Sequence, residues 1–439
     1  MKTVPDSVST LRTFLANNAS IKFIRFQWVD FCGVLNARVA TTNFASSLVQ
    51  KNAPISLPSP MQLISLIDGT VLWDECKLGI DGLWPDWSSL KVCHYYTNHA
   101  QVMCFIEEDM HGDGEGARFR SCPRWRLLEL TKSVKINHNI DFLVGVEVEF
   151  MILEESQGGL QPAKMVDNVY STASLNNKYL PVLEEIVNSI SQAGIEVRQF
   201  HSEGSTGLFE ISLEPLSPLL SADALIYSKE AIKTICFKHR LRATMFPKPF
   251  EKLSGIGIHH HLSISPKDNE ESFLAGLLEN WKSLAAFYMP NYDSYSRVRP
   301  NQWITWGLRN KTATINKVHS GHWELRTIDG IAHPYLTMLA ILSAGMQGLE
   351  QKRNLVIKNL NKIMFVGFDS QEAADEFAVK EKLPTSLKES ISSLKSNKCL
   401  TDALGPEIIS RYIRIKTKEE EIFSKIVGSE RREIAMRLF

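Results

Sequence analysis

One stretch, from Phe142 to Leu153, constrains the fold more than any other because it is apolar except for two glutamates. In an extended strand, residues two apart share a face, so Glu147 and Glu149 point to one side while Val146 and Val148 point to the other. A strand that is apolar on both faces is buried within a sheet. Two neighbouring buried carboxylates are costly unless a positive partner compensates them, and a divalent cation is the simplest one. The alternative is an edge strand whose glutamates face water.

The composition narrows the class of partner. The 439 residues contain 49 Lys and Arg and 49 Asp and Glu, so the formal net charge of zero gives no support for a nucleic-acid partner or for a polybasic membrane anchor. The seven cysteines are scattered, with no C-x-x-C pair, which disfavours a zinc site and favours a reducing compartment. The sequence has no apolar run of membrane-spanning length and no apolar signal core at its start, so we expect a cytoplasmic protein without a membrane partner.

The first part of the chain is predicted to be rich in β-strands. Residues 21–33 are rich in β-branched and aromatic side chains and end in an Asp30-x-x-Gly33 turn, which is typical of a hairpin. Short strands and turns, punctuated by prolines, continue to Phe105. We therefore expect a small β-rich domain over residues 1–115.

The polar, glycine-rich segment 111–116 is the best candidate for a domain boundary. After it the spacing of apolar residues predicts helices that begin near Pro123 or cover residues 181–193, 222–240, 272–289 and 334–350. From about Leu383 the chain is charged and helical in pattern. Because strands and helices are interspersed, we predict an α+β fold with a second, catalytic domain over residues 116–439.

A second acidic stretch runs from His201 to Ser212. Gly204 and Gly207 interrupt any helix, so Glu203 is expected in or near a loop. Glu210 begins an alternation of polar and apolar residues whose apolar members face the core. The alternative is a turn that carries two solvated glutamates.

A third stretch, from Ser254 to Ser263, combines glycines with three consecutive histidines. On a strand, His259 and His261 share a face with Ser263, whereas His260 points to the other side. The glycines before them allow a ligand or another backbone to approach closely. Only alternate histidines can reach one metal ion; the alternative is a set of histidines hydrogen-bonded within the core.

A fourth stretch begins at Arg297 and ends with a strand in which His322, Glu324 and Arg326 share one face. The opposite face carries Trp323, so this strand suits the wall of a polar cavity, although a solvated sheet face would have the same pattern. The four stretches together offer an oxygen-rich set of metal ligands that fits Mg²⁺ or Mn²⁺ better than zinc. Such ions, with Lys and Arg nearby, would neutralise and align a nucleoside triphosphate for phosphoryl transfer.

In this order, the motifs of the chain resemble those of the glutamine synthetase family between about Ile21 and about Leu349. They are Asp-x-x-Gly, Gly-x-Glu-x-Glu-Phe, Glu-x6-Glu, Gly-x-Gly-x-His-x-His-x-Ser, Arg-x-x-Pro and Glu-x-Arg. The sequence Gly-His-Trp-Glu at residues 321–324 is most similar to that of the fungal glutamine-synthetase-like branch related to FluG. The resemblance implies an N-terminal β-grasp domain and a C-terminal domain with a curved antiparallel sheet. It also implies a ring-shaped homo-oligomer, a decamer or dodecamer, whose sites are shared between neighbours.

The resemblance further implies roles for individual residues. The metal ligands would form two sets, namely Glu149, Glu203 and Glu210, and Glu147, His259 and Glu324. The residues that face ATP would be His261, Ser263 and Lys311. The residues beside the acid and amine substrates would be Ser254, Gly255 and Trp303. Three further residues would act in a reaction that passes through an acyl phosphate, namely Asp30 of the neighbouring subunit, Arg297 and Arg326.

Several positions depart from the family pattern and bear on the substrate. Trp303 stands where glutamine-forming members carry a flap glutamate, which favours an organic amine over ammonia. Lys311, Asn316 and His322 stand where arginines are common. Compared with arginine, lysine keeps the charge but cannot donate two parallel hydrogen bonds to one phosphate, and asparagine has no charge. We therefore expect an ATP-dependent carboxylate–amine ligase, with γ-glutamyl amide formation as the specific reaction. The alternatives are a metal-dependent enzyme that no longer uses ATP and a non-catalytic ring scaffold.

Overall fold

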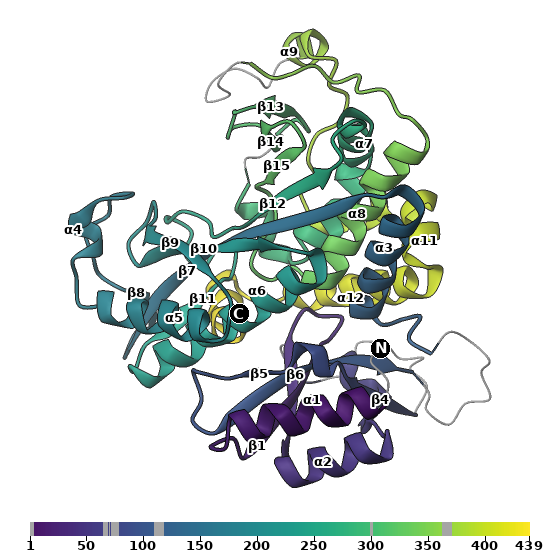
Figure 1. Ribbon diagram of the computed structural model, residues 1–439. Coiled ribbons are helices and arrows are strands. Elements are labelled where there is room, and N and C mark those ends of the chain that lie inside the picture. Colours follow the sequence, from purple (N-terminus) through teal and green to yellow (C-terminus); the bar gives the residue numbers. More distant parts are fainter. Residues whose placement is uncertain are drawn as a thin grey trace.

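The computed structural model describes residues 4–64, 69, 71, 79–108, 118–298, 302–361 and 371–439. Within these ranges the chain forms two sheets with helices packed against them, so the α+β prediction is confirmed (Figure 1). No helix in the described ranges is long and apolar enough to cross a membrane. The predicted boundary segment 111–116 lies outside the described residues, so the division of the chain at that point stays a prediction.

The first sheet is mixed and has six strands among the described residues, in the order β2-β1-β6-β4-β3 with β5 beside β6. The strands are β1 Phe23–Val29, β2 Leu35–Thr41, β3 Ile55–Pro58, β4 Ile80–Pro85, β5 Lys91–Val92 and β6 His99–Glu107. β1 is antiparallel to β2 and parallel to β6, which confirms the predicted hairpin. The helical elements of this part are α1 Val4–Asn17, α2 Thr42–Lys51, η1 Ser59–Gln62 and η2 Trp87–Ser89. Phe26, Leu83 and Val102 are fully buried in its core.

The second sheet has nine strands among the described residues, in the order β13-β14-β15-β12-β7-β10-β9, and β8 and β11 also pair with β7. Its strands are β7 Asp141–Ser156, β8 Gly159–Pro162, β9 Val197–Ser202, β10 Leu208–Leu216, β11 Arg242–Thr244, β12 Ile258–Ser265, β13 Trp306–Leu308, β14 Ile315–His319 and β15 His322–Leu325. Figure 1 shows that this sheet curls from β9 to β13. The strand that carries Glu147 and Glu149 is therefore central, with β10 and β12 on its two sides, and is not an edge strand.

One face of the second sheet packs on helices. Val148 and Phe150 on β7 are fully buried in the same cluster as Trp281 of α7 (Glu270–Tyr288) and Leu339 of α8 (Pro334–Glu350). The ring of Trp323 on β15 also stacks on a phenylalanine of α7. The apolar face predicted for these strands is therefore confirmed, and the polar residues of β7, β12 and β15 lie on the other face.

The remaining helices include those predicted near Pro123, at 181–193 and 222–240 and after about Leu383, together with short ones that were not predicted. They are α3 Pro123–His138, α4 Thr172–Leu175, α5 Leu180–Gln192, α6 Pro218–Lys238, η3 Tyr292–Ser296, α9 Gln371–Glu376, α10 Leu387–Ser396, α11 Lys398–Leu404, α12 Pro406–Phe423 and α13 Gly428–Leu438. α6 begins four residues before the predicted start at 222 because Pro218 lies in its first turn, where proline is well tolerated. The helical C-terminal stretch is confirmed.

Candidate active site

Strand register places the acidic residues in rows across the second sheet. Glu149 on β7 pairs with Glu210 on β10, which in turn pairs with His201 on β9. Two residues earlier on β7, Glu147 pairs with His259 on β12. Paired residues on neighbouring strands point to the same face, so motifs that are far apart in the sequence form one polar surface.

The polar surface continues toward the other edge of the sheet. His261 on β12 pairs with Glu324 on β15, and Glu324 pairs with Asn316 on β14. Ser263 pairs with His322 in the next row. The three strand motifs predicted from the sequence are therefore brought together by β12, which lies between the other two.

Glu147 is the centre of this surface because two imidazoles contact its carboxylate. Its two oxygens lie 3.3 Å from Nδ1 of His259 and 3.1 Å from Nε2 of His261. Burial acts to raise the pKa of Glu147, but the two histidine contacts outweigh burial and hold that pKa well below its ordinary value. His259 also lies 3.4 Å, through Nε2, from the buried carboxylate of Glu149. The side chain of His259 therefore joins both glutamates of β7.

Glu203 lies just after β9, in the loop that its flanking glycines predicted. His201 contacts two carboxylates, with Nδ1 3.7 Å from Glu203 and Nε2 3.2 Å from Glu210. Burial raises the pKa of Glu203, and the negative charges of Glu149 and Glu210 raise it further. Negative charge is therefore in excess at this end of the surface, which is what a bound cation would relieve.

His201 is a residue of this group that the sequence interpretation did not single out. Its signal was present in the alternation, because His201 precedes Glu203 by two positions at the end of a strand. What the sequence lacked was the register of β9 against β10, which places His201 opposite Glu210.

Glu324 is fully buried and both of its oxygens have partners. Oε2 accepts a hydrogen bond of 2.7 Å from Nδ2 of Asn316, and Oε1 accepts one from Nη1 of Arg326. Burial acts to raise the pKa of Glu324, but the charge of Arg326 and the Asn316 bond outweigh it and lower that pKa. Oε1 also lies 3.9 Å from Nδ1 of His259, so the carboxylate faces the Glu147 group.

Arg297 occupies the space left by two glycines. Its Nη1 donates to the carbonyl of Thr327 at 2.9 Å and its Nη2 donates to that of Arg326 at 2.7 Å. A Cβ on Gly255 would lie 2.5 Å from Cγ of Arg297, and one on Gly257 would lie 2.2 Å from Nη2. The sequence interpretation expected a ligand or another backbone at these glycines; the group that approaches them is the Arg297 side chain.

The face expected to meet ATP carries histidines. Nε2 of His322 lies 3.2 Å from Nδ1 of His261, and Nδ1 of His322 lies 2.7 Å from the hydroxyl of Ser263. The ring of His319 stacks on that of His322, with ring centres 4.7 Å apart. Burial acts to lower the pKa of His261, but the contact with Glu147 outweighs burial and raises that pKa. Lys311 is exposed, and its nearby charge opposes this rise.

Two further predicted residues, Asp30 and Trp303, have their contacts outside the polar surface described above. Asp30 is buried in its turn, where its carboxylate accepts hydrogen bonds from the amides of Cys32 and Val34 and from the side chain of Asn36. Trp303 is buried in a separate hydrophobic cluster, where the ammonium of a lysine lies 4.5 Å from its ring centre. Their roles toward an amine stay predictions.

Ser254 lies beside the Glu203 loop. Its amide donates to the hydroxyl of Ser205 at 2.9 Å, and its own hydroxyl donates to the carbonyl of Gly204 at 3.1 Å. Ser254 is exposed, so it lies at an open end of the polar surface. Its predicted contact with a substrate is untested.

The donor atoms suit Mg²⁺ or Mn²⁺. Among the residues that the structure describes, three groups have ligand atoms within 4.8 Å of one another, namely Glu147, His261 and Glu324; Glu147, Glu210 and His259; and His201, Glu203 and Glu210. The six metal ligands predicted from the resemblance lie on one surface, but their geometric grouping differs from the two predicted sets. In these three groups four glutamates lie beside three histidines, and hard divalent cations prefer such carboxylate oxygens.

Comparison with known proteins points to one family. Residues 120–434 match the family model described as glutamine synthetase, catalytic domain. Protein fluG of Emericella nidulans is 31% identical over 439 residues, which cover 97% of this chain and 50% of that protein, so the chain spans about half its length. The gamma-glutamylpolyamine synthetase GlnA3 of Streptomyces coelicolor is 26% identical over 332 residues, or 70% of each chain.

A solved structure titled GmaS/ADP complex, conformation 1, shares the fold. Its TM-score is 0.80 at 24% identity, and the alignment covers 95% of this chain and 98% of that one. The family model, which spans most of the chain, and the relation to FluG confirm the family suggested by the motifs. This chain belongs to the glutamine synthetase family of carbon–nitrogen ligases.

Proposed function

We propose that this protein is an ATP-dependent carboxylate–amine ligase that forms a γ-glutamyl amide with an organic amine. The observation that supports it is the polar surface centred on Glu147, where carboxylates and imidazoles converge within metal-binding distance. The names of two similar proteins add to this: one is a gamma-glutamylpolyamine synthetase and the other was solved with ADP.

The proposed metal ligands are the residues named above, with His201 and His261 added to the predicted set. Bound Mg²⁺ or Mn²⁺ would supply the positive charge that neutralises and aligns the phosphates of ATP. The protein's own part is to fix these ligands on one rigid sheet. Glu149 illustrates this, because Oε2 accepts a 2.5 Å hydrogen bond from the amide of Gly257 and the carboxylate is thereby oriented toward His259.

The proposed reaction has two steps. The carboxylate of the acid first attacks the terminal phosphorus of ATP, so that an acyl phosphate forms and ADP leaves. The amine nitrogen then attacks the acyl carbon, the C–N bond forms, phosphate leaves and the amine gives up a proton. Arg297 and Arg326 are proposed to bind the acid, and Asp30 of a neighbouring copy to accept the proton. A cytoplasmic ring assembly would provide that neighbour.

A second candidate is a metal-dependent reaction without ATP. It is favoured by one observation: Asn316, at a position where arginine is common, uses its side-chain amide to hold Glu324. His322 likewise contacts Ser263 and His261. Of the three positions where arginine is common, namely Lys311, Asn316 and His322, only Lys311 keeps a permanent positive charge that could face a phosphate.

Calorimetry with ATP in the presence of Mn²⁺, with EDTA as the control, separates the two candidates. The ligase requires metal-dependent ATP binding, followed by phosphate release when glutamate and a panel of amines are added. Metal binding without ATP binding by the folded protein would favour the second candidate and reject the first.

Variants of Glu147 on β7 and of Glu324 on β15 test the site itself. Glu147→Ala or Glu324→Ala is expected to lower the affinity for Mn²⁺ and the metal-dependent activity by at least about 100-fold, because each removes a proposed ligand. Glu155→Ala is the matched control on β7, since Glu155 lies at the solvent-exposed end of that strand and pairs with Arg437. Full activity in either site variant would refute the assignment.

A further inference from the structure

Helix α13 carries a buried arginine whose hydrogen bonds reach the segment that precedes Arg297. Arg431 donates twice to the carboxylate of Asp293, from Nε at 2.6 Å and from Nη2 at 2.8 Å, so the two side chains form a bidentate ion pair. Nη1 of Arg431 donates to the carbonyls of Phe423 and Ile426 at 3.1 and 2.9 Å. Four of the five N–H groups of this guanidinium therefore join α13 to Asp293 and to the end of α12 and the turn after it.

Asp293 lies in η3, the short helix that leads directly into Arg297. Asn291 caps this helix: its side chain accepts from the amide of Asp293 at 3.1 Å, and its own amide donates to the hydroxyl of Ser294 at 3.1 Å. At the other end of η3, the amide of Arg297 donates to the carbonyl of Ser294 at 3.2 Å. The backbone of Arg297 is therefore set by η3, and the ion pair ties η3 to α13.

Helix α13 also supports the segment that receives the Arg297 side chain. Met436 of α13 and Ile256 are buried in the same hydrophobic cluster. Ile256 lies between Gly255 and Gly257, the two glycines that leave room for the side chain of Arg297. One helix therefore contacts both the segment that carries this arginine and the segment against which its guanidinium packs.

We propose that Arg431 is a positioning residue for the acid substrate, because it fixes η3 and thereby holds Arg297 where its guanidinium can bind a carboxylate. This inference rests on the proposed function, in which Arg297 binds the acid. Arg431 is itself buried and donates to Asp293 and to backbone carbonyls, so its effect on the acid must pass through η3. The charges of the ion pair compensate each other, so the effect is one of placement.

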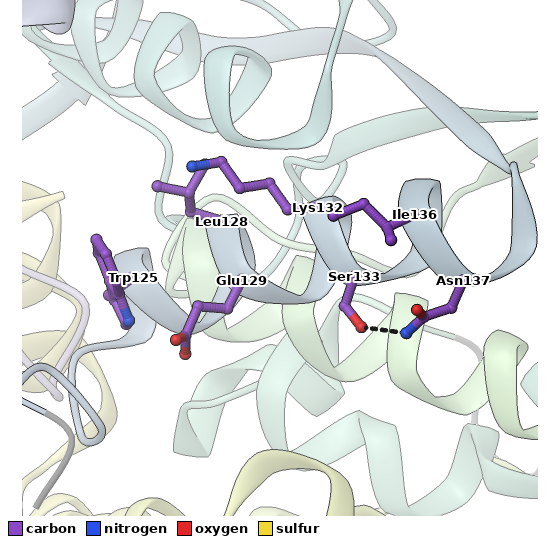
Figure 2. A pocket seen from close by; sticks show the side chains of 7 residues that line it. All are labelled: Trp125, Leu128, Glu129, Lys132, Ser133, Ile136 and Asn137. Carbon is purple, nitrogen blue, oxygen red and sulfur yellow. Dashed lines mark hydrogen bonds between the residues drawn. The ribbon is translucent and has the colours of Figure 1, made fainter. Parts of the chain in front are cut away.

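The alternative is an ion pair that stabilises the fold and nothing more, and the chain offers a matched control for it. Arg124 of α3 is also buried and donates to Asp223 of α6 from Nε at 3.1 Å and from Nη2 at 2.7 Å. Its other ion-pair partner is Asp86, which caps η2, so this arginine joins elements other than η3. Figure 2 shows the side chains that line a hollow along α3, and Arg124 is not one of them, so Arg124→Met leaves that lining in place.

Hydrogen exchange on the full chain tests whether Arg431 fixes η3. In peptides that cover residues 290–298, Arg431→Met is expected to exchange on the order of tenfold faster than the wild type, because η3 loses its tie to α13. Arg124→Met should leave exchange in these peptides unchanged. Arg431→Lys keeps the buried charge, so it is the variant to use if Arg431→Met does not fold, and it should still exchange faster because one ammonium cannot replace the fork. Wild-type exchange of η3 in both Arg431 variants would overturn the proposal.

Steady-state phosphate release tests the consequence for the acid. Arg431→Met and Arg431→Lys should raise the KM for glutamate by about tenfold or more, because a small displacement of an orienting group is costly. Their KM for ATP and their Mn²⁺ affinity should stay at the wild-type value, since the proposed metal ligands lie on the sheet and its loops. An unchanged KM for glutamate in these variants, or an equal rise in Arg124→Met, would overturn the proposal and leave the ligase assignment intact. Absence of glutamate-dependent phosphate release by the wild type would instead reject the proposed function, and this inference with it.

Discussion

The substitution Gly257→Ala tests how tightly the site is built. Gly257 precedes β12, and a Cβ at this position would lie 2.2 Å from Nη2 of Arg297 and 2.6 Å from Nε2 of His259. Both distances are far inside van der Waals contact, so both side chains must move. The guanidinium of Arg297 ends a flexible chain and can rotate, whereas His259 is fixed by its contacts with two glutamates.

We expect Gly257→Ala to lower the affinity for metal more clearly than it lowers the free energy of unfolding. Overpacking of a buried site lowers the free energy of unfolding by about 1–3 kcal/mol, and the mobility of Arg297 favours the lower end. Displacing the His259 ring removes its alignment with Glu147 and Glu149, and a loss of support of this kind lowers metal affinity by about 10–100-fold. We therefore expect Gly257→Ala to remain folded in urea titrations while its Mn²⁺ affinity falls in calorimetry.

Gly204→Ala is the matched control for this experiment. Gly204 also lies next to a proposed ligand, but a Cβ there would meet its nearest neighbour, a valine methyl, at 3.5 Å, which is ordinary contact. This variant should bind Mn²⁺ like the wild type. If Gly257→Ala also binds Mn²⁺ with wild-type affinity, the position of the His259 ring does not matter to the ion and the metal assignment at β12 is wrong.

Two other predictions concern the buried charges near the N-terminal turn. Burial raises the pKa of Asp30 from an ordinary 3.8 to about 7, so the folded state holds this proton more tightly than the unfolded chain. The resulting stability is present at low pH and is lost as pH rises from about 4 to about 7, and urea titrations of Asp30→Asn should lack this component. Lys416 and Glu419 form a buried ion pair of 2.7 Å, so Lys416→Met should cost about 3–5 kcal/mol, whereas the added change Glu419→Leu should recover most of it. Equal costs in the single and double variants would contradict this.

Much of the site was predictable from alternation within single strands. The apolar character of both neighbours of Glu147 implied a buried strand, and the two-residue spacing of His259 and His261 implied a shared face. Both follow from the pleat of one strand and need no knowledge of its neighbours. Glu203 was likewise predicted in a loop from its local sequence, because Gly204 and Gly207 follow it closely.

What alternation cannot supply is the register between strands, and register decides which residues become partners. His201 belongs to the acidic group only because the register of β9 against β10 places it opposite Glu210. A shift of that register by one residue would turn its side chain to the other face. The same holds for Glu324, whose two oxygens are held by Asn316 and Arg326. Asn316 looked like the loss of a cation when read as a sequence position. In the fold its side-chain amide donates to Glu324, a proposed metal ligand, so the departure from the family pattern at this position leaves that buried carboxylate supported.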